Sequence, residues 1–277
     1  MAKCAQCGRQ LPPLSFGKKI CQWCAEYAAM KRGDVPEDAP QKVMPVAWTA
    51  AGSGRLVTQI LVGVNVAVFI AMAMAGVSLT EPTIRQLLVW GANAGPFTFG
   101  GQWWRLITYM FVHGGVFHIA FNLWCLWDLG ILCENLYGPW MYLAIYFLSG
   151  IAGGLGSVAW HPINVSVGAS GAIFGLAGAL IASFKLGEFS LPAGAISGLL
   201  RNLLIFVVIN VIWGFASSIT DNGAHLGGLL MGAIMGALVA VVAPDSRRIG
   251  RRAAVVVLSC AVVGAAWALL YHLLTRG

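Results

Sequence analysis

The strongest constraint on this chain is a long stretch without formal charge. From Asn135 to Phe184 there is no Asp, Glu, Lys or Arg, and a helix needs about 20 apolar residues to cross roughly 30 Å of hydrocarbon. The stretch is therefore long enough for two spans, with the turn expected at residues 161–164, His-Pro-Ile-Asn. The whole chain is 58% hydrophobic and 10% charged, which excludes a soluble globular protein.

Further apolar segments between charged residues bring the expected number of membrane spans to seven. They are Leu56–Val77, a segment between Arg105 and Asp128 or Leu132, Asn202–Thr220, Asn222–Ala243 and Ala253–Thr275. The chain is therefore predicted to be an all-α polytopic membrane protein. Residues 78–104 are rich in aromatic side chains and glycine, so we expect a loop lying partly in the headgroup interface.

Basic residues near the span ends predict the orientation in the membrane. With the N-terminus inside, the inner loops carry more basic residues than the outer side, which favours a cytosolic N-terminus and an outer C-terminus. We expect a prokaryotic cell membrane. The inner set is Lys42, Arg55, Lys185, Arg201, Arg247, Arg248, Arg251 and Arg252, and the outer set is Arg85, Arg105 and Arg276. Because the membrane explains this basic excess, no nucleic-acid partner is expected.

The first 30 residues predict a small metal-binding head. Cys4 and Cys7 form one CxxC pair, and Cys21 and Cys24 form a second. This spacing suits a tetrahedral structural zinc, and so short a segment needs such a staple to fold. Disulfides are the alternative, disfavoured on the cytosolic side. No apolar signal peptide is expected at the start of the chain. The head would be followed by a linker at 31–54, a core at 55–243, and a basic loop with the seventh span at 244–277.

Two polar residues stand near the starts of apolar segments, Ser170 in Gly-Ala-Ser-Gly and His225. Polar groups in a membrane span are costly and are usually functional. Three glycines share the helix face of the histidine, namely Gly228, Gly232 and Gly236. After the serine come Gly171 and Gly175, four residues apart, which is the spacing found in closely packed helix pairs. A neutral imidazole can then act as base for the serine. Each residue alone can equally be a packing or backbone-bonding feature.

The second span carries two hydrogen-bond donors one turn apart, His118 and Asn122. Hydrolysis of an amide places negative charge on the carbonyl oxygen, which such donors stabilise. His118 and Asn122 could instead bond only to each other. His113 lies off this face and is expected to order the loop end. Asp221, four residues before His225, is expected to cap its helix, with orientation of the imidazole as the alternative.

Four segments resemble motifs of the rhomboid family of intramembrane serine proteases. Residues 168–171 match the GxSG nucleophile motif, and residues 224–232 match AHxxGxxxG. Residues 113–122 resemble HxxxxHxxxN, and Trp104-Arg105 resembles the WR pair of the family's first loop. The order and spacing fit from about residue 56 to residue 243.

The resemblance implies a six-helix core, to which Ala253–Thr275 adds a seventh helix. It implies a Ser170–His225 dyad without a carboxylate, an oxyanion site of Asn122 and His118, and no catalytic cofactor. Gly168 and Phe174 would contribute to the binding site, with Phe174 packing against the histidine. The resemblance also implies structural roles for Trp104, Arg105 and Glu134.

The expected activity is hydrolysis of peptide bonds in or near the transmembrane segments of other membrane proteins. Substrates would enter laterally from the bilayer into a water-filled cavity open to the outer side. The alternative is a rhomboid-like pseudoprotease that binds membrane clients without cleaving them, although such relatives typically lack the serine or the histidine. A transporter is disfavoured because paired interrupted helices and charged midplane residues are missing. The partner of the head cannot be read from the sequence.

Overall fold

The computed structural model describes residues 3–8, 11, 19–21, 24–25, 28, 55–187, 193–216, 220–244 and 248–276. Within them the helices are joined by turns and irregular segments, and an isolated antiparallel β-bridge joins Asn93 and Ser166. The predicted linker at 31–54 lies outside the described residues. So do most of the predicted head, Lys42 and Arg247.

Seven long helices make up the membrane body in the described part of the chain. Six are long and apolar enough to cross a membrane, and α8, with 17 residues, is shorter. The predicted all-α fold with a core and a further C-terminal helix is confirmed. The long helices are α2 (Leu56–Met74), α6 (Val116–Tyr137), α7 (Pro139–Trp160), α8 (Ser170–Leu186), α9 (Ala193–Ala216), α10 (Asn222–Val242) and α11 (Ile249–Arg276). Short helices α3 (Ile84–Val89), α4 (Gly95–Thr98) and α5 (Arg105–Thr108) lie between α2 and α6.

The predicted position of the second span is wrong. The sequence predicts a span between Arg105 and Asp128 or Leu132, whereas α6 begins later, at Val116, and continues to Tyr137. Glu134 therefore lies inside the helix, where its carboxylate accepts hydrogen bonds from the backbone N–H groups of Val57 and Thr58, both at 3.0 Å. These are unpaired donors of the first turn of α2, which favour a negative charge. The charge is thus compensated by a neighbouring helix and does not end the span.

The predicted start of the fifth span is also too late. It was placed at Asn202, after a basic residue, whereas α9 already begins at Ala193 and includes Arg201. The Arg201 side chain is exposed. A long basic side chain on an outer helix face can extend along the surface toward polar surroundings while its backbone stays helical, so the charge does not interrupt the helix.

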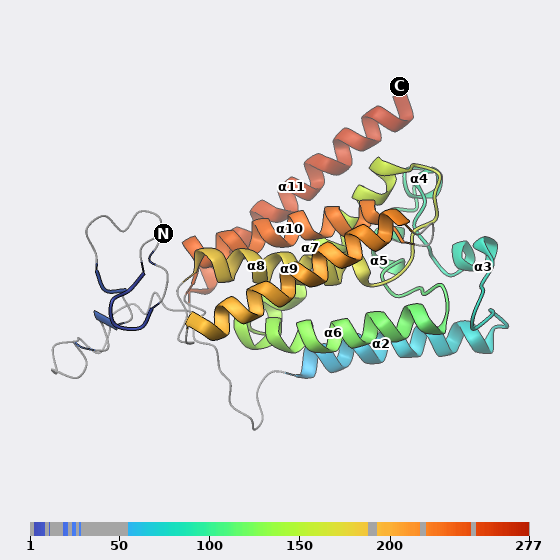
Figure 1. Ribbon diagram of the computed structural model, residues 1–277. Helices are drawn as coiled ribbons and strands as arrows, with labels where there is room; N and C mark the ends of the chain where they lie inside the picture. The colour runs from blue at the N-terminus through green and yellow to red at the C-terminus, as the bar shows by residue number, and fades with distance from the viewer. Residues whose placement is uncertain are drawn as a thin grey trace.

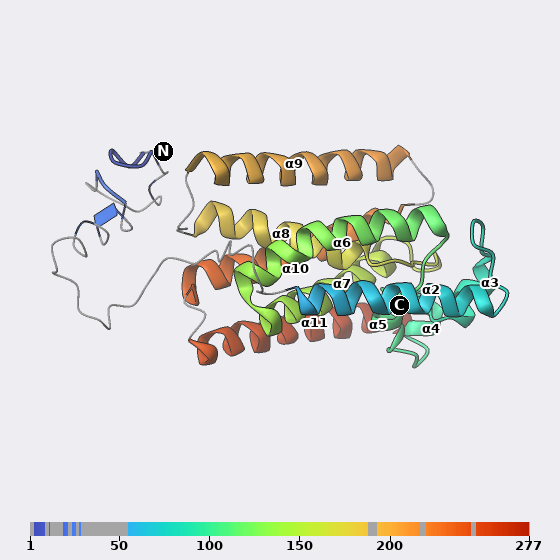
Figure 2. The same cartoon turned by 90° about the horizontal axis from the view of Figure 1, so that it is seen from below.

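The helices run alternately up and down the bundle, so α2 starts at one end and α11 finishes at the other (Figure 1). α8 and α10 both begin at the end where the short helices α3 and α4 lie. Seen from below, α9 and α11 lie on opposite sides of the bundle (Figure 2). The starts of the serine and histidine helices therefore share one end of the molecule.

Glycine brings the backbones of α8 and α10 into direct contact, as the sequence predicted. A Cβ atom on Gly228 would overlap the carbonyl oxygen of Gly171, and one on Gly232 would overlap that of Gly175. Gly236 meets Ala179 in the same way. Each step of four residues along α10 is matched by a step of four residues along α8, so the two helices run parallel. Such close approach is possible only without side chains at the contact.

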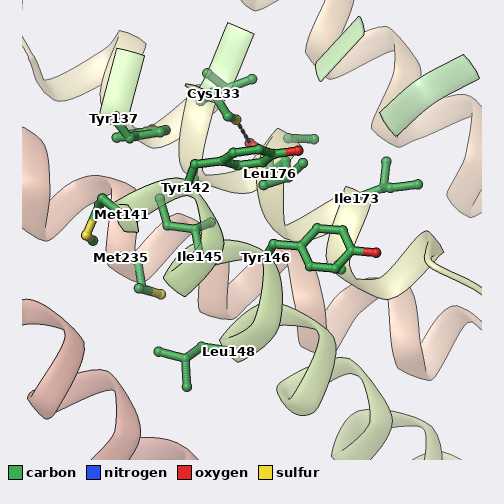
Figure 3. Packing of buried hydrophobic residues seen from close by; sticks show 14 of the residues in the cluster. Cys133, Tyr137, Met141, Tyr142, Ile145, Tyr146, Leu148, Ile173, Leu176 and Met235 are labelled. Atoms are coloured by element: carbon green, nitrogen blue, oxygen red, sulfur yellow. Dashed lines mark hydrogen bonds between the residues drawn. The ribbon is translucent and has the colours of Figure 1, made fainter. Parts of the chain in front are cut away.

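The apolar core is centred on α7, which packs against α8 and α10. Figure 3 shows how its side chains fill the space between the helices, with Tyr142 and Tyr146 among them. The Cys133 sulfur of α6 faces the Leu176 carbonyl of α8 at 3.9 Å (Figure 3). α6 and α7 join through the single residue Gly138, whose φ of 79° is one that glycine readily adopts.

Candidate active site

Ser170 is the first residue of α8 and directly follows the loop of residues 161–169, which is held by hydrogen bonds to other segments. The loop pairs with the 91–95 segment, since Asn93 and Ser166 exchange backbone hydrogen bonds of 3.0 and 2.8 Å. Nearer the serine, the Gly168 N–H donates to the Tyr109 carbonyl at 2.9 Å. Seventeen residues of helix span only about 25 Å, which is shorter than the hydrocarbon layer. Ser170 is therefore expected to be recessed.

Glycine is required at position 168, two residues before the serine. Its φ of 108° lies in the region that other residues rarely adopt. A Cβ atom there would also come within 2.7 Å of the His118 Nε2 atom. The His118 ring thus lies directly against the backbone that leads into Ser170.

His225 lies in the first turn of α10 and is 4% exposed. The Phe174 ring of α8 stacks on its imidazole, with centroids 4.0 Å apart and planes inclined by 8°. This contact sets the plane of the imidazole. Beside the two candidate residues, a Cβ atom on Gly171 would be 3.3 Å from the Ala224 carbonyl. The chain positions adjoining Ser170 and His225 are therefore in contact.

No carboxylate among the described residues accepts a hydrogen bond from His225. Its Nδ1 atom is buried without a hydrogen-bond partner there, and no hydrogen bond joins it to Ser170. The Asp221 carboxylate instead accepts from the Ala224 N–H at 2.9 Å, so the predicted helix cap is confirmed. Nucleophile–base hydrogen bonds are often long without substrate, so the geometry is compatible with a dyad.

His118 and Asn122 flank Gly168 from α6. The Gly114 N–H donates to His118 Nδ1 at 3.3 Å, which places the ring proton on Nε2, the atom that faces Gly168. A Cβ atom on Gly168 would be 3.8 Å from Asn122 Nδ2. Asn122 uses one N–H in a 2.8 Å bond to the His118 carbonyl and has a second N–H to offer. Both donors thus border the approach to Ser170.

His113 is fully buried at the end of the loop before α6, where the sequence placed it. Its ring meets the His118 ring edge-on, with centroids 5.3 Å apart, and its Nδ1 lies 3.2 Å from the Phe111 carbonyl. Burial, with a smaller contribution from the charge of His118, lowers the pKa of His113 to about 3. The ring is therefore neutral near pH 7, and it supports His118 by packing.

Arg105 and Trp104 do not contact Ser170 in the described structure. The Arg105 guanidinium donates to the Leu88 and Ala92 carbonyls at 2.9 and 2.7 Å and lies 4.9 Å from the Phe97 ring centroid. Trp104 is the N-cap of α5 and is 46% exposed. The arginine thus holds the turn at residues 88–92. Glu134 lies one helix length from His118, at the opposite end of α6.

Sequence reasoning missed two residues that support the site. The buried Tyr109 hydroxyl donates to the Gly150 carbonyl at 2.6 Å, while its own carbonyl accepts from Gly168. Asn93 donates from its side chain to the Gly154 carbonyl at 2.9 Å. Both connect the serine loop to α7. Neither belongs to a periodic or motif-like pattern, so no signal in the single sequence could have found them.

Four cysteines near the N-terminus form a second candidate site. The sulfur atoms of Cys4, Cys7, Cys21 and Cys24 all lie within 4.8 Å of one another, and those of Cys7 and Cys21 are 3.6 Å apart. Four thiolates on one zinc, each at about 2.3 Å, are about 3.8 Å apart. All four cysteines are free of disulfides. The donor set therefore fits a metal such as zinc.

The fold is that of a helical membrane protein, and comparison with known proteins identifies its class. The model of the Rhomboid domain matches residues 100–242. The chain belongs to the rhomboid family.

Relatives include two bacterial proteins and one from a parasite. Rhomboid protease GluP of Bacillus subtilis (strain 168) is 34% identical over 209 residues, 74% of this chain and 39% of the relative. Rhomboid protease AarA of Providencia stuartii is 31% identical over 213 residues, 69% of this chain and 75% of the relative. Rhomboid-like protease 2 of Toxoplasma gondii is 37% identical over 177 residues, 61% of this chain and 60% of the relative.

Proposed function

We propose that this protein is an intramembrane serine endopeptidase that cleaves transmembrane proteins, with Ser170 as nucleophile and His225 as base. The observation that carries the proposal is the glycine contact between α8 and α10, which holds the starts of the two helices together beside His118. The protease names of the relatives support the same activity.

The proposed reaction uses only side chains and backbone groups of this chain. Ser170 Oγ attacks the carbonyl carbon of the scissile peptide bond, while His225 takes the hydroxyl proton. His225 then gives that proton to the leaving amine as the C–N bond breaks. A water molecule attacks the resulting ester, with His225 accepting its proton and returning it to Ser170. The products are a new carboxyl group, a new amine and the free serine.

The negative charge of the tetrahedral intermediates would meet three kinds of donor. His118 Nε2–H faces Gly168, and Asn122 has a free N–H beside it. The backbone N–H groups of the first turn of α8 have no partner within the helix and carry its positive dipole. Donors already in place for a developing oxyanion stabilise the transition state more than the ground state.

The substrate is proposed to enter from the bilayer past α9. In the most apolar part of α9 only 6% of the residues are buried, against 44% in α10. Figure 2 shows α9 as an outer helix. Its Phe206 lies 5.4 Å, centroid to centroid, from Phe174, the ring that stacks on His225. Movement of this loosely packed helix would therefore open the site without breaking the α8–α10 contact.

Cleavage of a labelled transmembrane substrate by the purified protein in liposomes tests the proposal. We expect two fragments whose new ends define one peptide bond, together with covalent labelling of Ser170 by a fluorophosphonate probe. A protein that binds the substrate but yields neither fragments nor labelling would be a pseudoprotease, and the proposed function would be wrong.

Replacing Asn122 by alanine is expected to lower kcat about 100-fold while KM stays within about two-fold, because one oxyanion donor is lost. Steady-state kinetics with the liposome substrate measure both values. Asn210→Ala is the matched control, since Asn210 makes the same 2.8 Å bond to the carbonyl four residues earlier, that of Phe206. An equal loss in both variants would contradict the oxyanion role of Asn122.

For the N-terminal head, we propose a structural zinc bound by the four cysteines, which would fold the segment. Cys4→Ser with Cys7→Ser is expected to remove one zinc per chain, measured by elemental analysis, while the helical content of the membrane body is unchanged. Cys260→Ser, at an exposed cysteine of α11, is the control. A variant that retains its zinc would contradict this ligand set.

We also propose that the N-terminus is cytosolic, that the C-terminus lies outside, and that the membrane is a prokaryotic cell membrane. The head would occupy residues 1–30 and the protease core residues 55–243, with residues 244–277 adding the last helix. The start of α2 and the end of α11 lie at opposite ends of the bundle (Figure 1), which supports opposite sides for the termini.

A further inference from the structure

The C-terminal helix α11 is the part of the membrane body that the proposed reaction does not use. It is bound to the core at two distant points. Near its start, the buried Arg252 donates to two backbone carbonyls at helix ends. Tyr137 is the last residue of α6, and Ala243 is the C-cap of α10. A cation is favoured at such helix ends. The start of α11 is therefore held at the end of the bundle opposite to Ser170.

Near its end, α11 holds an aromatic residue of the loop between α2 and α6. The Trp267 ring lies 4.7 Å from the Phe99 ring, and Tyr271, one turn later, lies 6.2 Å from it, between centroids. Phe99 is 9% exposed and closes α4. Leu106 and residues of α7 complete this apolar cluster.

Helix α4, whose C-cap is Phe99, is hydrogen-bonded directly to the serine loop. In α4, the Gly95 N–H donates to the Pro162 carbonyl at 2.9 Å, and Thr98 donates to the Asn93 side chain at 2.6 Å. Asn93 in turn exchanges two backbone hydrogen bonds with Ser166. Residues 93–99 thus hold the serine loop, residues 161–169, by hydrogen bonds, and they contact α11 through Phe99.

We infer that Trp267 and Tyr271 are positioning residues for the proposed hydrolysis, acting through Phe99, α4 and the serine loop. Their contact with Phe99 would keep Ser170 in register with His225 and His118. A displacement of about 1 Å of a reacting group can lower a rate about 100-fold. The seventh helix would therefore be part of the support of the active site as well as a membrane span.

Trp267→Ala is expected to lower kcat about tenfold with KM within about two-fold, since substrate binding is not touched. Hydrogen exchange at the amides of Asn93, Gly95 and Ser166 is expected to rise about tenfold, because their bonds open more often. Trp267→Phe should restore both values. Leu269→Ala, on the exposed face of the same helix, is the control for α11 itself.

The exchange measurement requires no activity, so it separates this inference from the proposed function. Unchanged exchange at the three amides in Trp267→Ala would overturn the inference even if the protein is a protease. Faster exchange with an unchanged kcat would overturn the positioning role. A double-mutant cycle of Phe99→Leu and Trp267→Leu must show non-additive effects, and additive effects would also overturn it.

Discussion

Replacing Ser170 by alanine is expected to abolish cleavage, with a loss on the order of 10⁴-fold or more, and His225→Ala is expected to do the same. Without the serine there is no nucleophile for an ester intermediate, and without the His225 imidazole the proposed base is lost. The Asp221 carboxylate is engaged as the cap of α10, where it accepts from the Ala224 N–H, so we do not expect it to replace the base. The measurement is turnover in liposomes, with thermal unfolding as the check on folding.

Each variant has a control of the same residue type in α11. Ser259 is buried with an unpartnered hydroxyl, and His272 is exposed near the end of the helix. Alanine at either position should leave turnover close to that of the unmodified protein. Because the two residues act as a unit, the double variant should be no slower than either single variant. Residual cleavage by Ser170→Ala would exclude the proposed mechanism.

Gly232→Ala is expected to destabilise the protein by about 2–3 kcal/mol and to remove most of its activity. The new methyl group would overlap the Gly175 carbonyl of α8, and overpacking of this kind costs about 1–3 kcal/mol. The helices can relieve the overlap only by moving apart, which would separate Ser170 from His225. Thermal unfolding and turnover of the same preparation measure the two effects.

Gly63→Ala in α2 is the matched control, because a Cβ atom there meets no atom within 4 Å. The same substitution should be neutral at this position, or stabilising by up to about 1 kcal/mol, since alanine is the better helix former. Gly232→Ala is thus expected to lower stability and Gly63→Ala is not. Equal stability of both would show that the α8–α10 contact tolerates a side chain, against the packing described above.

The parts of the fold that follow from local pattern were predicted correctly. Apolar length predicted the seven long helices, and glycine spacing identified the faces of α8 and α10 that meet. The errors arose where a charge was taken as the end of a span. Glu134 and Arg201 lie inside helices. Glu134 is hydrogen-bonded by another helix, and the Arg201 side chain is exposed on the outside of α9. Neither circumstance is visible in the residue's own neighbours along the chain.

The sequence by itself determined the candidate chemical residues and the long apolar segments that become membrane helices, since composition and periodicity are local properties. Only the tertiary structure decided which helix ends meet. It placed His118 Nε2 against Gly168. It also confirmed two expectations, the packing of Phe174 on His225 and the capping of α10 by Asp221. Tyr109 and Asn93 became recognisable only there, because their hydrogen bonds join segments that are distant in the chain. Such contacts depend on packing between helices, which no single segment encodes.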